Sequence, residues 1–144
     1  MYGTTLIPTG GSDAAFAAVD DAVEVTAPDG TVHVLGVVED LPTYERSGAP
    51  GRADNDGEEQ RLRLEAAVGR IETEVTAAGL DCETRIAEGV PSREIVTFAD
   101  EVGADAIVMG TRSAADAAGD LLGSTTERVL RDASTTVVSV PATA

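Results

Sequence analysis

Short apolar runs alternate with helical patterns along the whole chain. Residues 5–8, 31–38, 106–109 and 136–140 read as strands, and residues 80–87 alternate apolar and polar positions, as an edge strand with one wetter face does. Apolar residues at helical spacing separate these runs, so that consecutive strands pair in parallel through helical crossovers. The pattern predicts one doubly wound α/β domain over residues 1–144, with a five-stranded parallel sheet and helices on both faces.

Four helices are predicted from apolar positions three or four residues apart. Ser12 is expected to cap the first helix, Pro91 to begin the third, and Gly103 to end it. The polar segment 39–57 is rich in Pro, Gly and acidic residues and is expected to be a mobile loop. The marker residues are Phe16, Val19 and Val23; Leu64, Val68, Ile71 and Val75, ending near Gly79; Ile95, Phe98, Ala99 and Val102; and Leu122, Thr126, Val129 and Leu130.

Two segments rich in Gly and hydroxyl residues follow the first and fourth strands: PTGGS at 8–12 and MGTRSAADAAGDLLGSTTERVL at 109–130. In doubly wound sheets, ligands bind beyond the carboxyl ends of the strands. Gly123 and Ser124 begin the last helix, whose free N–H groups and dipole favour an anion. Gly110 leaves the strand end open, and Ser113 and Ser124 can donate hydrogen bonds to phosphate. These residues indicate a phosphate site.

The same residues also have a purely structural interpretation. Ser124 and Glu127 form the S-x-x-E pattern of a capping box, which stabilises a helix whether or not a ligand is present. Glu127 and Arg131 are spaced for an i,i+4 ion pair. The run GDLLGS lacks the lysine and the length of a P-loop. Spacing alone therefore leaves phosphate binding and plain turn chemistry equally open.

The strongly acidic charge of the chain limits the kinds of molecule that it can bind. The chain has 26 acidic and ten basic residues, a net charge of -16, and every basic residue is Arg. Such a surface has no basic patch to neutralise the phosphates of nucleic acid, so we expect no nucleic-acid partner. The absence of Lys favours adaptation to high salt, where self-repulsion is screened. An ordinary acidic protein with a biased coding sequence is the alternative.

Little in the chain suggests catalysis. His33 is the lone histidine and Cys82 the lone cysteine, and we expect both to be packed side chains. No Cys/His cluster suggests zinc. The N-terminus has no signal-peptide pattern, and no apolar run reaches the roughly 20 residues of a membrane span. The sequence therefore predicts a cytoplasmic protein with no membrane partner.

The opening residues MYGTTLIPTGGSDAAFAAVDDAV and the stretch MGTRS…GS resemble the universal stress protein A family. In that family the first strand ends in Pro-x-Asp-Gly-Ser, and a signature runs Gly, two residues, Gly, nine residues, Gly, then Ser or Thr. Gly110 takes the first place, and nine residues separate Ser113 from Gly123 and Ser124. The resemblance spans the chain, including GVPSREIVTFADEVGADAIVMG and STTVVSVP, and a high-salt, acidic member would have this composition.

The resemblance implies a Rossmann-like fold of the adenine nucleotide α-hydrolase type with strand order 3-2-1-4-5. It also implies homodimers through the last strand, Thr136 to Val140, and ATP as ligand, with Mg²⁺ held by the phosphates. Carried over by position, the ribose and phosphates contact one group of residues and the adenosine another. The first group is Met109, Gly110, Ser113, Gly123, Ser124 and Thr125; the second is Pro8, Thr9 and Gly10, with Val38 against the adenine.

Two departures from the family pattern keep a second function open. Ser113 stands where the signature has its second Gly, and Gly10 stands where the first motif has an acid that reaches the nucleoside. A dimeric interaction protein that no longer binds nucleotide is therefore the alternative to an ATP-binding stress-response module. An enzyme of adenylate chemistry is a third reading without an identifiable catalytic residue. With no general base or activating lysine in sight, we expect slow ATP hydrolysis at most.

Overall fold

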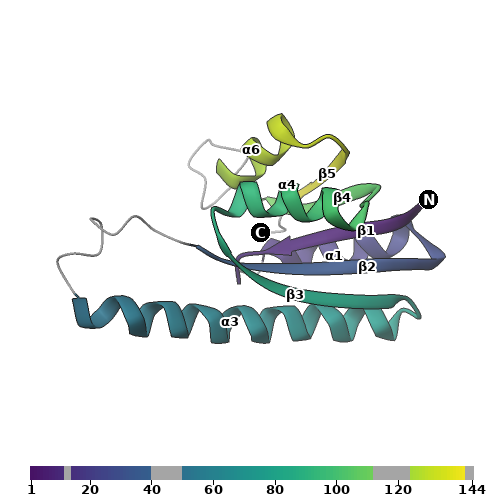
Figure 1. The fold of residues 1–144 in the computed structure, drawn as a ribbon. Coiled ribbons are helices and arrows are strands. Elements are labelled where there is room, and N and C mark those ends of the chain that lie inside the picture. The colour runs from purple at the N-terminus through teal and green to yellow at the C-terminus, as the bar shows by residue number, and fades with distance from the viewer. Residues whose placement is uncertain (12–13, 40–49, 112–123, 142–144) are drawn as a thin grey trace.

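Five strands form one parallel sheet in the order β3-β2-β1-β4-β5 (Figure 1). The computed structural model describes residues 1–11, 14–39, 50–111 and 124–141. The number of strands, their parallel pairing and their order confirm the predictions from the sequence. The strands are β1 (Tyr2–Thr9), β2 (Thr26–Glu39), β3 (Asp81–Gly89), β4 (Ala106–Thr111) and β5 (Thr136–Pro141).

Helices cover both faces of the sheet. α1 (Ala14–Val25) and α3 (Pro50–Ala77) pack on one face, and α4 (Pro91–Val102) and α6 (Ser124–Asp132) on the other. Figure 1 shows α3 below the sheet and α4 and α6 above it. None of the helices in the described ranges is long and apolar enough to cross a membrane.

The central strands have apolar residues on both sides, which is why their sequences are almost continuously apolar. Along β1, Ile7 packs with α1 and α3, whereas Leu6 packs with α4 and α6. Along β4, Val108 faces α1 and α3, and Ile107 and Met109 face the opposite helices. Successive side chains of a strand point to opposite faces, so each short strand contributes to both halves of the core.

The predicted loop over 39–57 is wrong from Pro50 onward, because α3 begins there and runs for 28 residues. Residues 40–49 lie outside the described ranges. Gly51 and Gly57 suggested a loop, since Gly is a poor helix former. Proline, however, is favoured in the first turn of a helix, and the apolar stripe around Leu64 to Val75 extends the helix by cooperative propagation.

Other boundaries differ by a few residues. Thr126 and Val129 are buried as predicted for α6, but Leu130 is 41% exposed, so it does not belong to the core face. Gly103 takes a left-handed φ of 67° at the C-cap of α4, as predicted for the residue that ends this helix. The predicted cap Ser12 and the predicted marker Leu122 lie outside the described ranges.

The two edges of the sheet differ in chemistry. β3 exposes charged side chains, among them Asp81, Glu83 and Glu88, whereas β5 has half-buried valines at Val137 and Val138. Charged edge strands oppose pairing with another chain, and apolar ones favour it.

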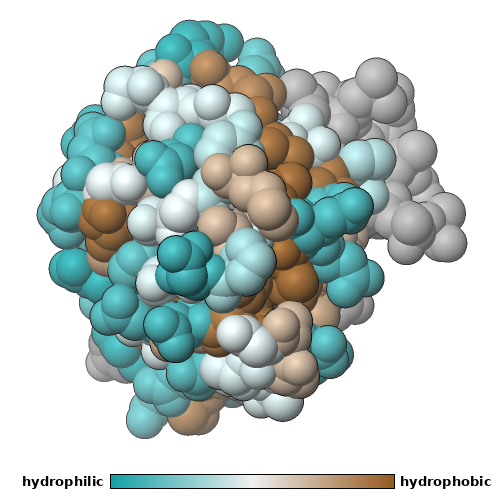
Figure 2. All heavy atoms as spheres, turned by 90° about the vertical axis from the view of Figure 1, so that its right-hand side faces the viewer, coloured by the Kyte–Doolittle hydropathy of each residue, from teal (hydrophilic) through white to brown (hydrophobic). Residues whose placement is uncertain are grey.

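Figure 2 views the end of the molecule that carries the N-terminus, where a band of hydrophobic side chains runs between hydrophilic ones.

Candidate functional site

A cavity of about 230 Å³ lies where β1, β2 and β4 end. The carboxyl ends of these strands meet there, with α1, α3, α4 and α6 around them. β1 and β4 are neighbours at the centre of the sheet, and the chain leaves β1 through α1 on one face and β4 toward α6 on the other face. The cavity therefore occupies the place where doubly wound sheets bind ligands.

Six residues assigned to the site from the sequence line this cavity. They come from two chain segments more than 90 residues apart in the sequence, which the parallel pairing of β1 with β4 brings together. The six are Pro8, Thr9, Gly10, Met109, Gly110 and Thr125.

The other four residues assigned from the sequence are not among the described residues that line the cavity. Val38 is buried but does not line the cavity, whereas its neighbour Val37 does. Adjacent strand residues point to opposite faces, and Val37 shares the face of Ile95 from α4. Ser113 and Gly123 lie outside the described ranges, and so does the side chain of Ser124, the residue at which α6 begins.

Seven further residues line the cavity that the sequence reasoning did not assign to it. Most come from helices, and a helix face cannot be placed over a strand end from sequence periodicity alone. The signal that could have found Glu39 was its position directly after the apolar run of β2. The seven are Ala15, Val37, Glu39, Gln60, Pro91, Ile95 and Thr126.

The turn after β1 is held by a local hydrogen bond. The N–H of Gly11 donates to the hydroxyl oxygen of Thr9 over 3.0 Å, and Gly11 has a φ of 93°, which favours Gly. Gly10 is exposed, and a Cβ placed on it would meet no atom of the described residues within 4 Å. Space for a longer side chain therefore exists at Gly10, at the edge of the cavity.

The lining divides into an apolar wall and polar ends. Val37, Ile95 and Met109 are buried apolar side chains that suit the faces of a flat heterocycle. Gln60 and Glu39 provide amide and carboxylate groups, and Glu39 makes no ion pair or hydrogen bond within the described ranges. The start of α6, next to Thr125, brings helix N–H groups that favour an anion.

The lone histidine and lone cysteine lie away from the cavity. His33 is half-buried, and its ring meets the Phe98 ring edge-on at 5.9 Å between centroids, which confirms that it is a packed residue. Cys82 is half-buried on β3, and burial, with smaller contributions from Glu72 and Glu83, raises the pKa of its thiol to about 11. Within the described residues, no three His, Cys, Asp or Glu side chains gather as a metal site.

Comparison with known proteins agrees with this architecture. Residues 1–141 match the profile of the universal stress protein family. The chain belongs to the universal stress protein family. It is 33% identical over 143 residues to universal stress protein MJ0531 of Methanocaldococcus jannaschii, and the match covers 97% of this chain and 82% of that protein.

Two solved structures extend the comparison. The structure of the hypothetical protein MJ0577 matches with a TM-score of 0.83 and 27% identity, covering 99% of this chain and 98% of that one. A universal stress protein solved in complex with cAMP matches with a TM-score of 0.68 and 29% identity, covering 99% and 98%. The fold is thus shared over almost the whole length with a family member that holds an adenine nucleotide.

Proposed function

We propose that this universal stress protein binds an adenine nucleotide, ATP in the first place, in the cavity at the carboxyl ends of β1, β2 and β4. The observation that carries the proposal is the convergence of Gly10, Met109, Gly110 and Thr125 on one cavity beside the start of α6. A family relative of 29% identity was solved with cAMP, which supports an adenine nucleotide as ligand.

The chemistry of the lining fits the parts of such a ligand. Val37, Ile95 and Met109 suit the faces of the purine, and Glu39 and Gln60 can accept hydrogen bonds from hydroxyl or amino groups. The phosphates would lie at the start of α6, with Ser113, Gly123 and Ser124 as their further ligands. Magnesium would be held there through the phosphate oxygens.

The test is mass spectrometry of small molecules released from the purified protein, followed by calorimetric titration with ATP and Mg²⁺. Bound ATP, ADP or AMP, or a 1:1 titration, supports the proposal. The variant Gly123→Val, which places a branched side chain where the phosphates would lie, should lose binding. An empty protein that also gives no heat with ATP would refute it.

Gly10 supports a second candidate, a dimeric interaction protein that has lost the nucleotide. The sequence has Gly10 where the family places an acid, and no side chain of the described residues fills that position. This candidate is favoured if the titration above fails while the protein still forms dimers. Turnover of ATP faster than its spontaneous hydrolysis would instead favour an enzyme.

We further propose that two copies join through β5. The half-buried Val137 and Val138 make this edge apolar, and the charged β3 edge is unsuited to such pairing. Lysine substituted for the exposed Ser139 should block the contact, whereas lysine at the exposed Thr84 of β3 should not. Light scattering after size-exclusion chromatography gives the mass; a monomeric wild-type protein contradicts the proposal.

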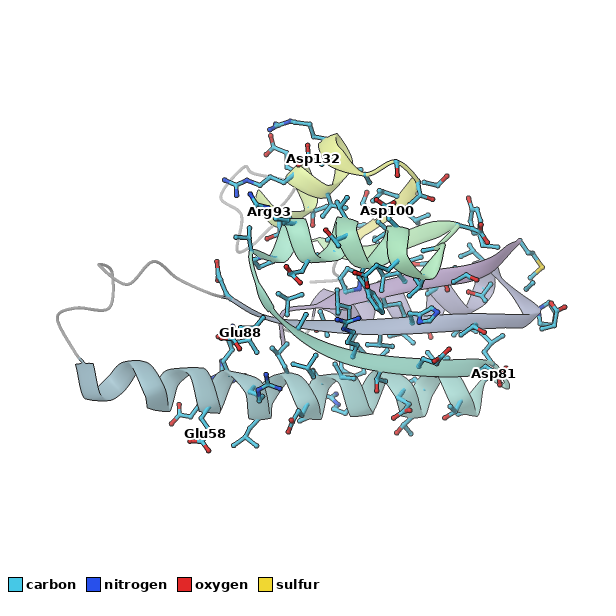
Figure 3. The ribbon with its side chains drawn as sticks, viewed as in Figure 1. Glu58, Asp81, Glu88, Arg93, Asp100 and Asp132 are labelled. Atoms are coloured by element: carbon cyan, nitrogen blue, oxygen red, sulfur yellow. The ribbon has the colours of Figure 1, made fainter. Side chains whose placement is uncertain are left out.

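Adaptation to high salt is the remaining part of the proposal. The exposed acids include Glu58, Asp81 and Asp100, shown in Figure 3 on three different elements, so the negative charge is spread over the surface. At about 1 M salt the Debye length is about 3 Å, so the repulsion between these negative charges is screened. The melting temperature should therefore rise steeply with KCl; a flat dependence contradicts this part. The cytoplasmic location stays a prediction.

A further inference from the structure

Among the described residues that line the cavity at the strand ends, Glu39 alone has an ionisable side chain. Glu39 is exposed, and it makes no ion pair or hydrogen bond with another part of the described chain. The other polar side chains of this lining, three threonines and one glutamine, are neutral. A carboxylate accepts hydrogen bonds and donates none, so the part of a ligand that Glu39 binds must be a donor.

The position of Glu39 relative to Gly10 follows from the register of β1 and β2. Thr9 lies opposite Gly36 in this parallel pair, so the next residue, Gly10, lies beside Val37. Glu39 is two residues further along β2, a distance of about 7 Å, and lies on the same face of the sheet as Val37. Both Gly10 and Glu39 line the cavity, and one sugar ring can therefore lie between the two positions.

The charges around the cavity set the direction in which a nucleotide would lie. The N–H groups at the start of α6, beside Thr125, favour an anion. Glu39 has the same sign of charge as phosphate and repels it. Because β1 separates β2 from β4, the ends of these two strands are about 10 Å apart. A bound nucleotide would therefore place its phosphates at the β4 end and a neutral, hydroxyl-bearing part beside Glu39.

Ribose has the donors that suit this carboxylate. Its 2′- and 3′-hydroxyl groups lie on adjacent carbon atoms, so both can donate to the two oxygens of one carboxylate. In doubly wound dinucleotide-binding domains, an acid about 20 residues after the glycine-rich turn accepts a hydrogen bond from the ribose. Glu39 has a comparable place, because it ends the strand that follows the Gly10–Gly11 turn and α1.

We propose that Glu39 binds the ribose diol of the nucleotide, in place of the acid that the family has at position 10, and so selects ribonucleotides over deoxyribonucleotides. This role rests on the nucleotide binding proposed above, and it assigns the group that recognises the sugar. The carboxylate comes from the end of β2 instead of the end of the neighbouring strand β1. The site can therefore bind a nucleotide although Gly10 has no side chain.

The test compares ATP with 2′-deoxy-ATP and 3′-deoxy-ATP by calorimetric titration of the full-length protein with Mg²⁺ present. Each deoxynucleotide should bind about tenfold more weakly than ATP, the lower end of the range for a hydrogen bond to a charged group, because Glu39 is exposed. In Glu39→Ala this ratio should fall to about one, since the acceptor is gone. The ratio excludes a general effect of charge, because the three nucleotides carry the same phosphates.

Glu88→Ala is the matched control. Glu88 carries the same charge on the next strand, β3, and forms an ion pair of 4.0 Å with Arg61 of α3, away from the cavity (Figure 3). This variant should keep the preference of about tenfold for ATP. A second variant returns an acid to the end of β1: Gly10→Asp, made in the Glu39→Ala protein, should restore a preference for ATP of at least about threefold.

Equal affinity of the wild-type protein for ATP and both deoxynucleotides overturns this role of Glu39 and leaves nucleotide binding itself intact. A preference for ATP that persists in Glu39→Ala overturns it as well. If the wild-type protein binds none of the three nucleotides, the proposed function fails together with the role of Glu39. Misfolding cannot imitate the expected result, because Glu39→Ala should bind 2′-deoxy-ATP at least as tightly as the wild-type protein does.

Discussion

The hydroxyl of Thr5 donates a hydrogen bond to the hydroxyl oxygen of Thr26, 2.8 Å away, between β1 and the start of β2. The direction follows from the second bond of Thr26, whose own O–H donates to the carbonyl oxygen of Ala22 in α1. Both threonines are buried, with Thr5 fully enclosed and Thr26 2% exposed. The pair ties the end of α1 to the central strand.

This chain of donors predicts unequal effects of two isosteric substitutions. Thr5→Val leaves the Thr26 hydroxyl bonded to Ala22 and should lower the free energy of unfolding by about 1 kcal/mol. Thr26→Val leaves the Thr5 hydroxyl buried without an acceptor and should cost about 1–3 kcal/mol. Urea unfolding of both variants measures the difference. Equal losses would show that the direction of the hydrogen bond is wrong.

Gly30 should tolerate no side chain. A Cβ there would lie 2.7 Å from the carbonyl oxygen of Gly3 and 2.8 Å from a methyl carbon of Thr26, where β2 begins with an irregular register beside β1. Gly30→Ala should lower stability by about 1–3 kcal/mol, because the backbone must shift. Gly69→Ala, in α3, is the control, because its Cβ meets no atom within 4 Å among the residues that the structure describes. It should stabilise by up to about 1 kcal/mol. Thermal unfolding measures the two melting temperatures, and equal values for the two variants would contradict this prediction.

Cys82 should react slowly. Its pKa, raised from 9.0 to about 11 by burial first and by Glu72 and Glu83 second, leaves little thiolate at neutral pH. Alkylation by iodoacetamide should therefore be on the order of 10²-fold slower at pH 8 than for a free cysteine, with the midpoint of the rise in rate near pH 11. A midpoint near pH 9 would contradict the burial of this thiol.

The same shift affects stability in alkaline solution. Because the folded-state pKa is the higher one, the native protein holds the thiol proton more tightly than the unfolded chain does. Stability is fully present below pH 9 and is lost as the pH rises toward 11. Cys82→Ser has no ionising group at this position, so it should lose less stability over this range. Denaturant titrations of both proteins at several pH values give the comparison.

Gly10 and Glu39 should act on nucleotide affinity in opposite directions. The open space at Gly10 accepts the family's acid, so Gly10→Asp should tighten ATP binding about 2- to 13-fold, the value of one good hydrogen bond. Glu39→Gln should weaken it if the carboxylate accepts a hydroxyl proton of the ribose. Arg61→Gln, a charge change outside the cavity, is the control. If neither substitution changes the affinity for ATP, the nucleoside does not bind at this end of the cavity.

The sheet could be predicted from the sequence because each central strand is apolar on both sides and each helix between them has one apolar stripe. Apolar runs located β1 and β4 to within three residues, whereas β2 begins at Thr26, five residues before the predicted start. The start of α3 could not be predicted, since Pro50, Gly51 and Gly57 have local preferences that the packing of Leu64 to Val75 overrides.

The lining of the candidate cavity could be predicted where strand ends supply it but not where helices do. Pro8 to Gly10 and Met109 to Gly110 directly follow strands, so the topology places them. Gln60 and Ile95 reach the cavity only because α3 and α4 lie across the strand ends, which depends on packing angles that no local pattern encodes. The choice of Val37 over Val38 depends on which face of β2 meets α4, a one-residue difference that an apolar run cannot settle.

The contrast between the two edges of the sheet has a consequence for how large an assembly can grow. The proposed contact through β5 would be isologous, so it would use the same edge of both copies and leave none of that edge free. The resulting ten-stranded sheet would end on both sides in β3, where Asp81, Glu83 and Glu88 repel a third chain. If the proposed contact through β5 forms, growth would stop at two copies, and the acidic outer strands would oppose end-to-end fibre formation.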